Sequence, residues 1–204
     1  MKVELISYIT LNKLMESLPV TEIAENELLS HLSYTFTLED LSRACSHQIV
    51  RHRTASFSQQ SQRYIQVKRL QENVVTPSSI SDKAPKAFET FVSKASETYT
   101  ELVEAGVPKE DARFVLPNAT ETCLIMTMDG RSLIHFFGLR LCNRAQWEIR
   151  TLAEEMLNRV KEVEPELFSN VGPYCVQLGH CPEGRFSCGR IAEMTLRYGL
   201  KKGT

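Results

Sequence analysis

Segments with a two-residue apolar alternation lie between segments with a three- to four-residue apolar repeat, and this order limits the fold more than any other feature. The alternation falls on Lys2–Thr10, His31–Thr37 and Thr120–Met128, which predicts three short strands. The helical repeat runs from Phe88 to Val103 and from Ala145 to Val160, which predicts two long amphipathic helices. The aromatic residues of the first repeat are expected in the core. The chain therefore combines short strands with long helices.

Capping residues indicate where two further helices begin. Glu39 and Asp40 can cap a helix that starts at Leu41, whose apolar side carries Leu41, Ala44, Cys45 and Ile49. Asp129 is the expected N-cap of a helix that carries Leu133 to Leu141, and a second helix is expected to start near Asn143. Between these elements we expect one or two short helices over Asn12–Leu29, a connecting loop over Asn73–Pro85, a helical turn or loop over Asp111–Pro117, and a tail loosened by Pro and Gly from Glu164 onward.

Positive charge is concentrated in one part of the chain. Leu41–Gln71 contains six Lys and Arg and no Asp or Glu, whereas the whole chain has 24 Lys and Arg against 25 Asp and Glu. Removing this +6 segment from the net charge of −1 leaves −7 for the rest. Its centre, Arg51–Tyr64, also holds serines and glutamines. Such a concentration is expected where a protein holds an anion.

The residue types in Arg51–Tyr64 narrow the choice of anion. Arg binds phosphate or carboxylate with a planar fork of donors, and Ser adds hydroxyl donors. Gln offers a donor and an acceptor, so it can pair with the edge of a base. These types suit a nucleotide better than a bare phosphate. A solvated basic face and a nucleic-acid surface are the two alternatives that the residues leave open.

Size and composition exclude several classes of protein. At 204 residues the chain fits one domain, and 42% hydrophobic and 24% charged residues are ordinary for a globular protein. No apolar run reaches the ~20 residues of a membrane span. Met1–Leu5 lacks the features of a signal peptide, so the cytoplasm is the expected location. The balanced charge argues against nucleic acid as the partner.

The six cysteines are expected to be free thiols. Three of them, Cys175, Cys181 and Cys188, crowd the tail with His180. Their spacing differs from the short Cys-x-x-Cys hooks of common zinc sites, so the sequence favours a looped tail without a metal. The chain also lacks a phosphate-binding glycine loop, a dinucleotide fingerprint and a Ser nucleophile between glycines.

A series of motifs resembles the flavin-dependent thymidylate synthases. Arg51-His52-Arg53, followed after seven residues by Ser61 and then Arg63-Tyr64, is similar to the signature of that family. Similar motifs follow in the family's order: Arg113 to Pro117, Arg131 to Leu133, Leu139-Arg140, Ala145 to Arg150, and the tail pieces Gly172-Pro173, Cys181 to Gly184 and Ser187 to Gly189. The resemblance covers about His31 to Gly189.

The resemblance implies a fold and an activity. It implies a single α+β domain over 1–204, with a mixed or antiparallel sheet packed with long helices, a core at about 31–168 and a loop-rich tail at about 169–204. Such enzymes make dTMP from dUMP, with methylenetetrahydrofolate as one-carbon donor and NADPH-reduced FAD as hydride source. They are homotetramers whose active sites are shared between subunits.

The resemblance also implies site residues. The dUMP contacts would be Gln48, Arg51, Gln59, Gln60, Ser61, Gln62, Arg63, Arg113 and Arg140. The FAD contacts would be Arg51, His52, Arg53, Gln59, Asp129, Arg131 and His135. Arg140 would be catalytic, because a fixed guanidinium stabilises the negative charge that grows on the uracil ring. Ser61 is expected to bind substrate and not to act as a nucleophile, and no cysteine lies inside the motif.

Two departures from the family concern the flavin. Asn26–Ser30 replaces a His-rich segment that partly contacts FAD in the family, and the chain is some twenty-odd residues short there by resemblance. Asp129 stands where Asn is usual, and a carboxylate near flavin is unfavourable unless it is paired.

Two alternatives to dUMP methylation stay open. One is a UMP or other uracil-nucleotide methylase on the same fold, and the other is a paralogue that binds nucleotide without catalysis.

Overall fold

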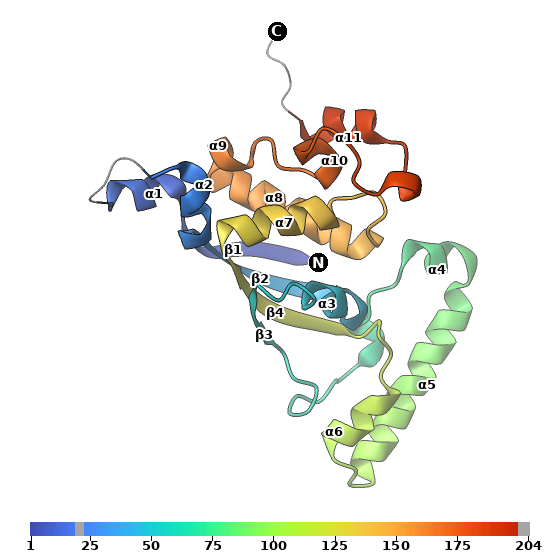
Figure 1. The fold of residues 1–204 in the computed structure, drawn as a ribbon. Coiled ribbons are helices and arrows are strands. Elements are labelled where there is room, and N and C mark those ends of the chain that lie inside the picture. Colours follow the sequence, from blue (N-terminus) through green and yellow to red (C-terminus); the bar gives the residue numbers. More distant parts are fainter. Residues whose placement is uncertain (19–22, 200–204) are drawn as a thin grey trace. The chain divides into compact units, whose positions relative to one another are not determined.

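The structure, a computed structural model, describes residues 1–18 and 23–199 (Figure 1). Its internal contacts divide the chain into two compact units, and each is described by itself. Unit 1 comprises Met1, Leu38–Gln48 and Ser58–Leu124. Unit 2 comprises Lys2–Thr37, Ile49–Phe57 and Ile125 onward, within the described residues. The expectation of one domain over 1–204 stays a prediction.

Four strands form one antiparallel sheet in the order β1-β2-β4-β3. They are β1 (Lys2–Ile9), β2 (Ser33–Ser42), β3 (Ser56–Gln59) and β4 (Glu121–Met128). The three predicted strands are confirmed. The sequence gives no sign of β3, because Ser-Phe-Ser-Gln has a single apolar residue and no alternation to detect.

The helix predicted to start at Leu41 begins later. β2 continues to Ser42, and α3 spans Arg43–Ile49. The cap is not Glu39 or Asp40 but Ser42, whose Oγ accepts a hydrogen bond from the Cys45 N–H at 3.0 Å. Asp40 has a φ of 56°, a left-handed conformation within the strand, and Leu41 beyond it is fully buried. The capping prediction was wrong because Leu41 is buried as a strand residue.

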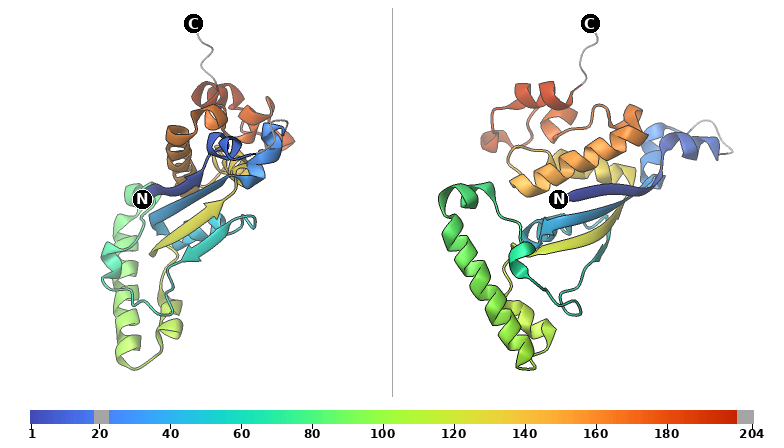
Figure 2. Two further views of the ribbon diagram at one scale, coloured as in Figure 1. Left: turned by 90° about the vertical axis from the view of Figure 1, so that its left-hand side faces the viewer. Right: turned by 180° about the vertical axis from the view of Figure 1, so that it is seen from behind.

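Unit 1 is organised around one long helix. In chain order it contains η2 (Leu70–Glu72), α4 (Ser78–Lys83), α5 (Pro85–Glu104), α6 (Lys109–Ala112) and η3 (Arg113–Val115). The side of α5 that carries Val92 and Ala95 packs on Leu70. Figure 2 shows α6 beside the C-terminal part of α5. Helix α4 lies within the segment predicted to be a loop, since its polar sequence carries no apolar repeat.

One aromatic residue of α5 is not in the core. Val92, Ala95 and Tyr99 are buried as predicted, but Phe91 is 54% exposed. The buried stripe of α5 follows positions 92, 95 and 99, and Phe91 lies outside it. The exposed ring therefore corrects the expectation that all aromatic residues of this helix are core residues.

Unit 2 is built on two helices that follow β4. α7 spans Gly130–Arg140 and α8 spans Trp147–Val163, and α8 packs on both α7 and β1. The predicted cap is confirmed, since Asp129 accepts a hydrogen bond from the Ser132 N–H at 2.8 Å. Arg159 of α8 donates to the Val3 carbonyl at 3.2 Å, which ties the helix to β1.

The short elements of unit 2 near the N-terminus are α1 (Leu11–Glu16), α2 (Glu25–Leu28) and η1 (Leu29–His31).

The short helices expected over 12–29 are confirmed as α1 and α2, although residues 19–22 of that segment lie outside the described residues. The carboxylate of Glu164, at the end of α8, is buried. It accepts hydrogen bonds from the Leu11 N–H at 2.6 Å and from the Tyr34 hydroxyl. The start of α1 is thereby fixed to the end of α8.

The C-terminal part is more helical than expected. It contains α9 (Pro165–Phe168), α10 (Tyr174–Gln177), η4 (Gly184–Phe186) and α11 (Ile191–Tyr198), of which α11 buries Met194 and Tyr198. Residues 200–204 of the predicted tail lie outside the described residues. Burial, followed by the neighbouring thiols of Cys142, Cys181 and Cys188, raises the pKa of Cys175.

The predicted fold class is confirmed: the chain is an α+β protein with a four-stranded antiparallel sheet and long helices. Within the described ranges, no helix combines the length and apolar character that crossing a bilayer requires.

Candidate functional site

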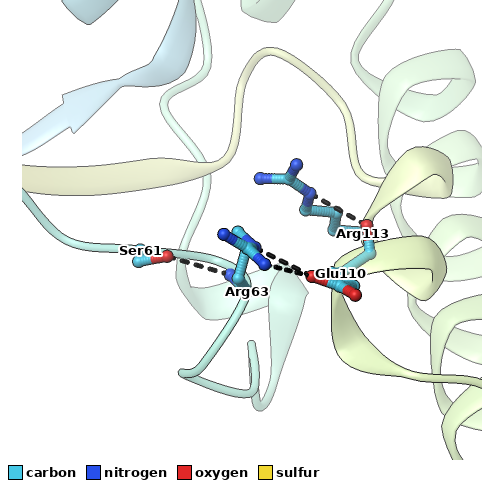
Figure 3. Close-up of polar contacts among 4 residues, drawn as sticks. All are labelled: Ser61, Arg63, Glu110 and Arg113. Atoms are coloured by element: carbon cyan, nitrogen blue, oxygen red, sulfur yellow. Dashed lines mark hydrogen bonds and ion pairs between the residues drawn. The ribbon is translucent and has the colours of Figure 1, made fainter.

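Unit 1 holds a group of charged side chains that we call the anion cluster: Ser61, Arg63, Glu110 and Arg113 (Figure 3). Arg63 donates to one carboxylate oxygen of Glu110 from Nε at 2.8 Å and approaches it with Nη2 at 2.6 Å. Arg113 donates from Nε to the Glu110 carbonyl at 3.0 Å. The hydrogen bond to Glu110 raises the pKa of Arg63. Two predicted dUMP contacts therefore meet at one residue, Glu110.

The glutamines beside Ser61 lie around a cavity. The Gln60 N–H donates to the Cys123 carbonyl at 3.0 Å, and Gln59 Nε2 donates to Thr122 Oγ1 at 3.2 Å, so both residues are held to β4. Gln60, Ser61 and Gln62 line a cavity of about 260 Å³. Gln62 Nε2 is buried and lacks a hydrogen-bond partner among the described residues. An orphaned buried donor is costly, so this atom indicates a place for an external acceptor.

Arg43 joins this group, although sequence reasoning did not select it as a site residue. Its guanidinium is half-buried at the start of α3. Burial, and after it the positive charge of Arg113, lowers the pKa of Arg43. Two guanidinium groups that repel each other are stabilised by an anion that both can approach. The sequence signal was available, because Arg43 is one of the six cations in the segment free of Asp and Glu.

Unit 2 holds a second group, the histidine–arginine cluster: His52, His135, Arg140 and Tyr174. Arg140 donates from Nε to His52 Nε2 at 2.9 Å. The His52 ring packs edge-on against Phe136 with centroids 4.8 Å apart, and lies 6.2 Å from the His135 ring. His135 Nδ1 shares a hydrogen bond with the Tyr174 hydroxyl. The predicted catalytic arginine is thus held by a predicted flavin contact.

His52 is neutral at physiological pH. Burial, then the charges of Arg140 and His135, lower the pKa of His52 to about 4. A neutral imidazole keeps a lone pair on Nε2, which the hydrogen bond from Arg140 requires. His52 therefore orients the guanidinium without cancelling its charge.

The tail supplies Tyr174, which sequence reasoning did not select. Its ring lies so close to Gly138 of α7 that a Cβ at that position would come within 2.9 Å of it. Gln177 adds hydrogen bonds from Nε2 to the Ile134 carbonyl at 3.2 Å and to the Gly172 carbonyl at 2.7 Å. Burial raises the pKa of Tyr174, so its hydroxyl stays protonated. Helix α10 is thereby fixed on the helix that carries Arg140.

The other predicted site residues fall in both units. In unit 1, Gln48 is half-buried on α3. In unit 2, Arg51 and Arg53 are exposed on either side of buried His52. At the start of α7, Arg131 donates from Nη2 to the Asn26 carbonyl at 2.7 Å.

Asp129 also lies at the start of α7. Its carboxylate accepts hydrogen bonds from both the N–H and the hydroxyl of Ser132. The charge that looked unfavourable near a flavin is therefore stabilised by the N-terminus of the helix.

The structure thus brings Arg63 together with Arg113 through Glu110 in unit 1, and His52 together with His135 and Arg140 in unit 2. Arg51, Arg53, Asp129 and Arg131 belong to unit 2 but not to the contacts of its cluster. Glu110, Arg43 and Tyr174 are additions from the structure. For Glu110 and Tyr174 the sequence carries no local signal, because their partners are distant along the chain.

Fold and clusters together define the class: an α+β protein with two arginine-containing clusters, one of which also holds a neutral histidine. Residues 11–166 match the sequence profile of a family described as "Thymidylate synthase complementing protein". The flavin-dependent thymidylate synthase of Geobacter sulfurreducens is 52% identical over 177 residues, which cover 86% of this chain and 76% of that protein. The chain belongs to the flavin-dependent thymidylate synthase family.

Further relatives carry the same name. The enzyme of Nitratidesulfovibrio vulgaris is 46% identical over 181 residues, covering 84% of this chain and 74% of the relative. The enzyme of Clostridium tetani is 44% identical over 190 residues, which cover 83% of this chain and 74% of the relative. The chain therefore spans about three quarters of the length of these relatives.

Solved structures with the same fold include two kinds of protein. A flavin-dependent thymidylate synthase of Helicobacter pylori, complexed with FAD and dUMP, aligns with a TM-score of 0.67 at 24% identity, over 84% of this chain and 100% of that one. A UMP/dUMP methylase of Streptomyces cacaoi, bound with 5-Br UMP, aligns with a TM-score of 0.68 at 23% identity. The alignment covers 84% of this chain and 94% of that one. At this identity the likeness shows the fold alone.

Proposed function

We propose that this chain methylates dUMP to dTMP with a bound flavin. The observation that carries the proposal is the 52% identity to a flavin-dependent thymidylate synthase over 86% of the chain. Each cluster contains residues of the motifs that resemble the family, namely Ser61, Arg63 and Arg113 in one and His52 and Arg140 in the other. The full reaction takes its one-carbon unit from methylenetetrahydrofolate and its reducing equivalents from NADPH.

The anion cluster is the proposed site of the nucleotide phosphate. Arg63 already holds a carboxylate in a two-donor geometry, and phosphate oxygens accept the same fork. Arg113 and the hydroxyl of Ser61 complete the donor set. Gln59, Gln60 and Gln62 contact the sugar and base, with the orphaned Gln62 Nε2 as one donor. Gln48 and Arg51 are the remaining proposed dUMP contacts.

Arg140 is the proposed catalytic residue. When C5 of uracil becomes nucleophilic, negative charge grows on the ring, and a guanidinium beside the ring stabilises it. His52 fixes the Nε of that guanidinium, so the group is oriented before the charge develops. Ser61 is proposed to bind the substrate through hydrogen bonds and not to act as a nucleophile, and its Oγ accepts the Arg63 N–H at 3.2 Å.

Seven residues are the proposed FAD contacts: Arg51, His52, Arg53, Gln59, Asp129, Arg131 and His135. These residues fit FAD. Exposed arginines suit its pyrophosphate, and the neutral ring of His52 offers a polar aromatic edge. FAD, when bound, supplies the hydride chemistry that side chains cannot. The protein positions the pyrimidine and excludes competing reactions.

The remaining parts of the proposal concern assembly and location. We expect a homotetramer with shared active sites in the cytoplasm. The expectation of a homotetramer rests on the resemblance to the family.

Methyl transfer by the purified chain tests the proposed function. Assays contain FAD, NADPH and methylenetetrahydrofolate, with each omitted in turn, and product is resolved by chromatography. Formation of dTMP that depends on every component supports the proposal. FAD uptake without dTMP formation, or dUMP binding by a protein that stays colourless, contradicts it and favours the binding-only paralogue.

UMP is the second candidate substrate, because the same fold binds a UMP analogue in the Streptomyces cacaoi methylase. Parallel assays with dUMP and UMP at equal concentrations compare kcat/KM. A higher value for dUMP is expected, and a strong preference for UMP would replace the thymidylate assignment.

A further inference from the structure

Four cysteine side chains line one cavity of unit 2. Its volume is about 320 Å³, and Cys142, Cys175, Cys181 and Cys188 lie in its wall. All four are free thiols. Cys142 comes from the turn between α7 and α8, Cys175 from α10, and Cys181 and Cys188 from the segment that follows α10. Three separate parts of the chain therefore each contribute a cysteine to the wall of one cavity.

The segment that carries two of these cysteines has little apolar burial to hold it. From Leu178 to Arg190 every residue is exposed except Cys181, which is half-buried. The backbone nevertheless follows defined turns, with positive φ at Gly179, Gly184 and Gly189. In small proteins whose core is insufficient, a cross-link or a metal ion supplies the missing stability, and we apply the same argument to this segment. Cys181 and Cys188 are the two residues in it suited to either role.

Charged residues around the cavity favour a metal ion held by thiolates. Four thiolates with one divalent cation carry a net charge of about −2. Arg140 and Arg144 line the same cavity and supply two positive charges. Arg144 also donates to the Phe186 carbonyl between Cys181 and Cys188, which places its charge beside that segment.

We propose that Cys142, Cys175, Cys181 and Cys188 bind one zinc ion in a structural tetrathiolate site. Thiolates are the ligands that zinc prefers, and four of them complete a closed tetrahedral site. On binding, each thiol releases its proton to solvent and no residue is oxidised. Within the described residues, no three Cys, His, Asp or Glu side chains stand ready to hold a metal, so the thiols must move inward as the ion binds.

A disulfide is the competing use of the same residues, and the observations favour the metal. A disulfide joins two thiols and leaves two others unused, whereas four cysteines line this one cavity. The spacing within the tail did not predict zinc, because the fourth thiol, Cys142, is supplied by a different part of the chain.

Metal analysis of the full-length, untagged chain tests the proposal without reference to catalysis. The zinc content of protein purified from zinc-supplemented cells is measured by plasma mass spectrometry. Replacement of zinc by cobalt is followed by the thiolate-to-cobalt charge-transfer absorbance. About one zinc ion per chain is expected in the wild type. Cys181→Ser and Cys188→Ser are expected to lose at least about tenfold in bound metal, whereas Cys123→Ser, whose thiol is outside the cavity, is the matched control and keeps it.

Three results would overturn the proposal. The first is a wild-type chain that binds neither zinc nor cobalt with its thiols reduced. The second is full zinc content in both tail variants. The third is loss of two titratable thiols to a disulfide in place of metal. The cobalt spectrum of the wild type keeps the proposal testable if a variant fails to fold.

Discussion

At the residue scale, the anion cluster shows how an arginine is held before its ligand arrives. Nε and Nη2 of Arg63 both contact one carboxylate oxygen of Glu110, and these are the donors that we propose for the phosphate. Both side chains are about half exposed, so the pair contributes little to stability. Its main consequence is competition, because the nucleotide must displace Glu110 to reach both donors.

Replacing Glu110 should therefore strengthen nucleotide binding. In Glu110→Gln the competing charge is lost, and the dissociation constant of dUMP is expected to fall by up to about fivefold, the range of an exposed ion pair. Calorimetric titration measures it. Asp111→Asn removes the same charge from the neighbouring position of α6 and should leave affinity nearly unchanged. Equal or weaker binding by Glu110→Gln would show that Glu110 does not compete.

Replacement of Arg140 is predicted to lower the rate of methyl transfer more than any other single substitution. Arg140→Ala should lower kcat by about 100-fold or more, as expected when a charge-stabilising donor is removed. Steady-state rates of dTMP formation measure this, with circular dichroism as the check on folding. Arg197→Ala, which breaks a surface ion pair with Glu154, is the control for loss of a guanidinium. Near-normal turnover in Arg140→Ala would remove its catalytic assignment.

His52 makes stability depend on pH in a defined direction. Its pKa is about 4 in the folded chain against an ordinary value of 6.5, so below pH 6.5 the unfolded chain takes up a proton that the folded chain does not. The free energy of unfolding should therefore fall as the pH drops from 6.5 towards 4, by about 2 kcal/mol at pH 5. Urea unfolding at pH 7 and pH 5 measures this. His52→Gln keeps an acceptor for Arg140 and should lose less stability between pH 7 and pH 5. An equal loss in this variant would show that His52 is not the source of the pH dependence.

At the scale of elements, side chains at helix ends decided where sequence patterns succeeded and failed. Asp129 was recognised as the cap of α7 because an apolar helical repeat follows it. Ser42, the cap of α3, was missed because two acidic residues precede it and look like better caps. Strand β3 and helix α4 have no apolar period, so only pairing and packing define them. The sequence could identify elements with a buried stripe and not those held by neighbours.

The cap of α7 gives a prediction at this scale. Asp129→Ala should lower the free energy of unfolding by about 1 kcal/mol, because the Ser132 N–H loses its acceptor. Asp129→Asn keeps an acceptor and should cost only a fraction of that. Thermal and urea unfolding compare the two variants. If both lose the same stability, the charge matters and the hydrogen bond does not.

At the scale of the whole molecule, the order of motifs along the chain predicted more of the site than local pattern did. Every proposed ligand contact came from resemblance, and the structure grouped Arg63 with Arg113 and His52 with Arg140. Glu110 and Tyr174 depend on contacts between distant segments, so no window of the sequence reveals them, whereas Arg43 lies in the cationic segment and was overlooked there. Tyr174 in particular shows that the tail belongs to the fold of unit 2.

The central claim is that this protein binds a uracil nucleotide beside a flavin, and the flavin spectrum tests it most directly. Protein loaded with FAD is titrated with dUMP while absorbance at about 450 nm is recorded, and NADPH oxidation is then followed with and without the nucleotide. We predict a saturable change in the flavin band and a rate of NADPH oxidation that responds to dUMP. A chain that takes up no FAD, or a flavin spectrum and oxidation rate that ignore saturating dUMP, would contradict the account.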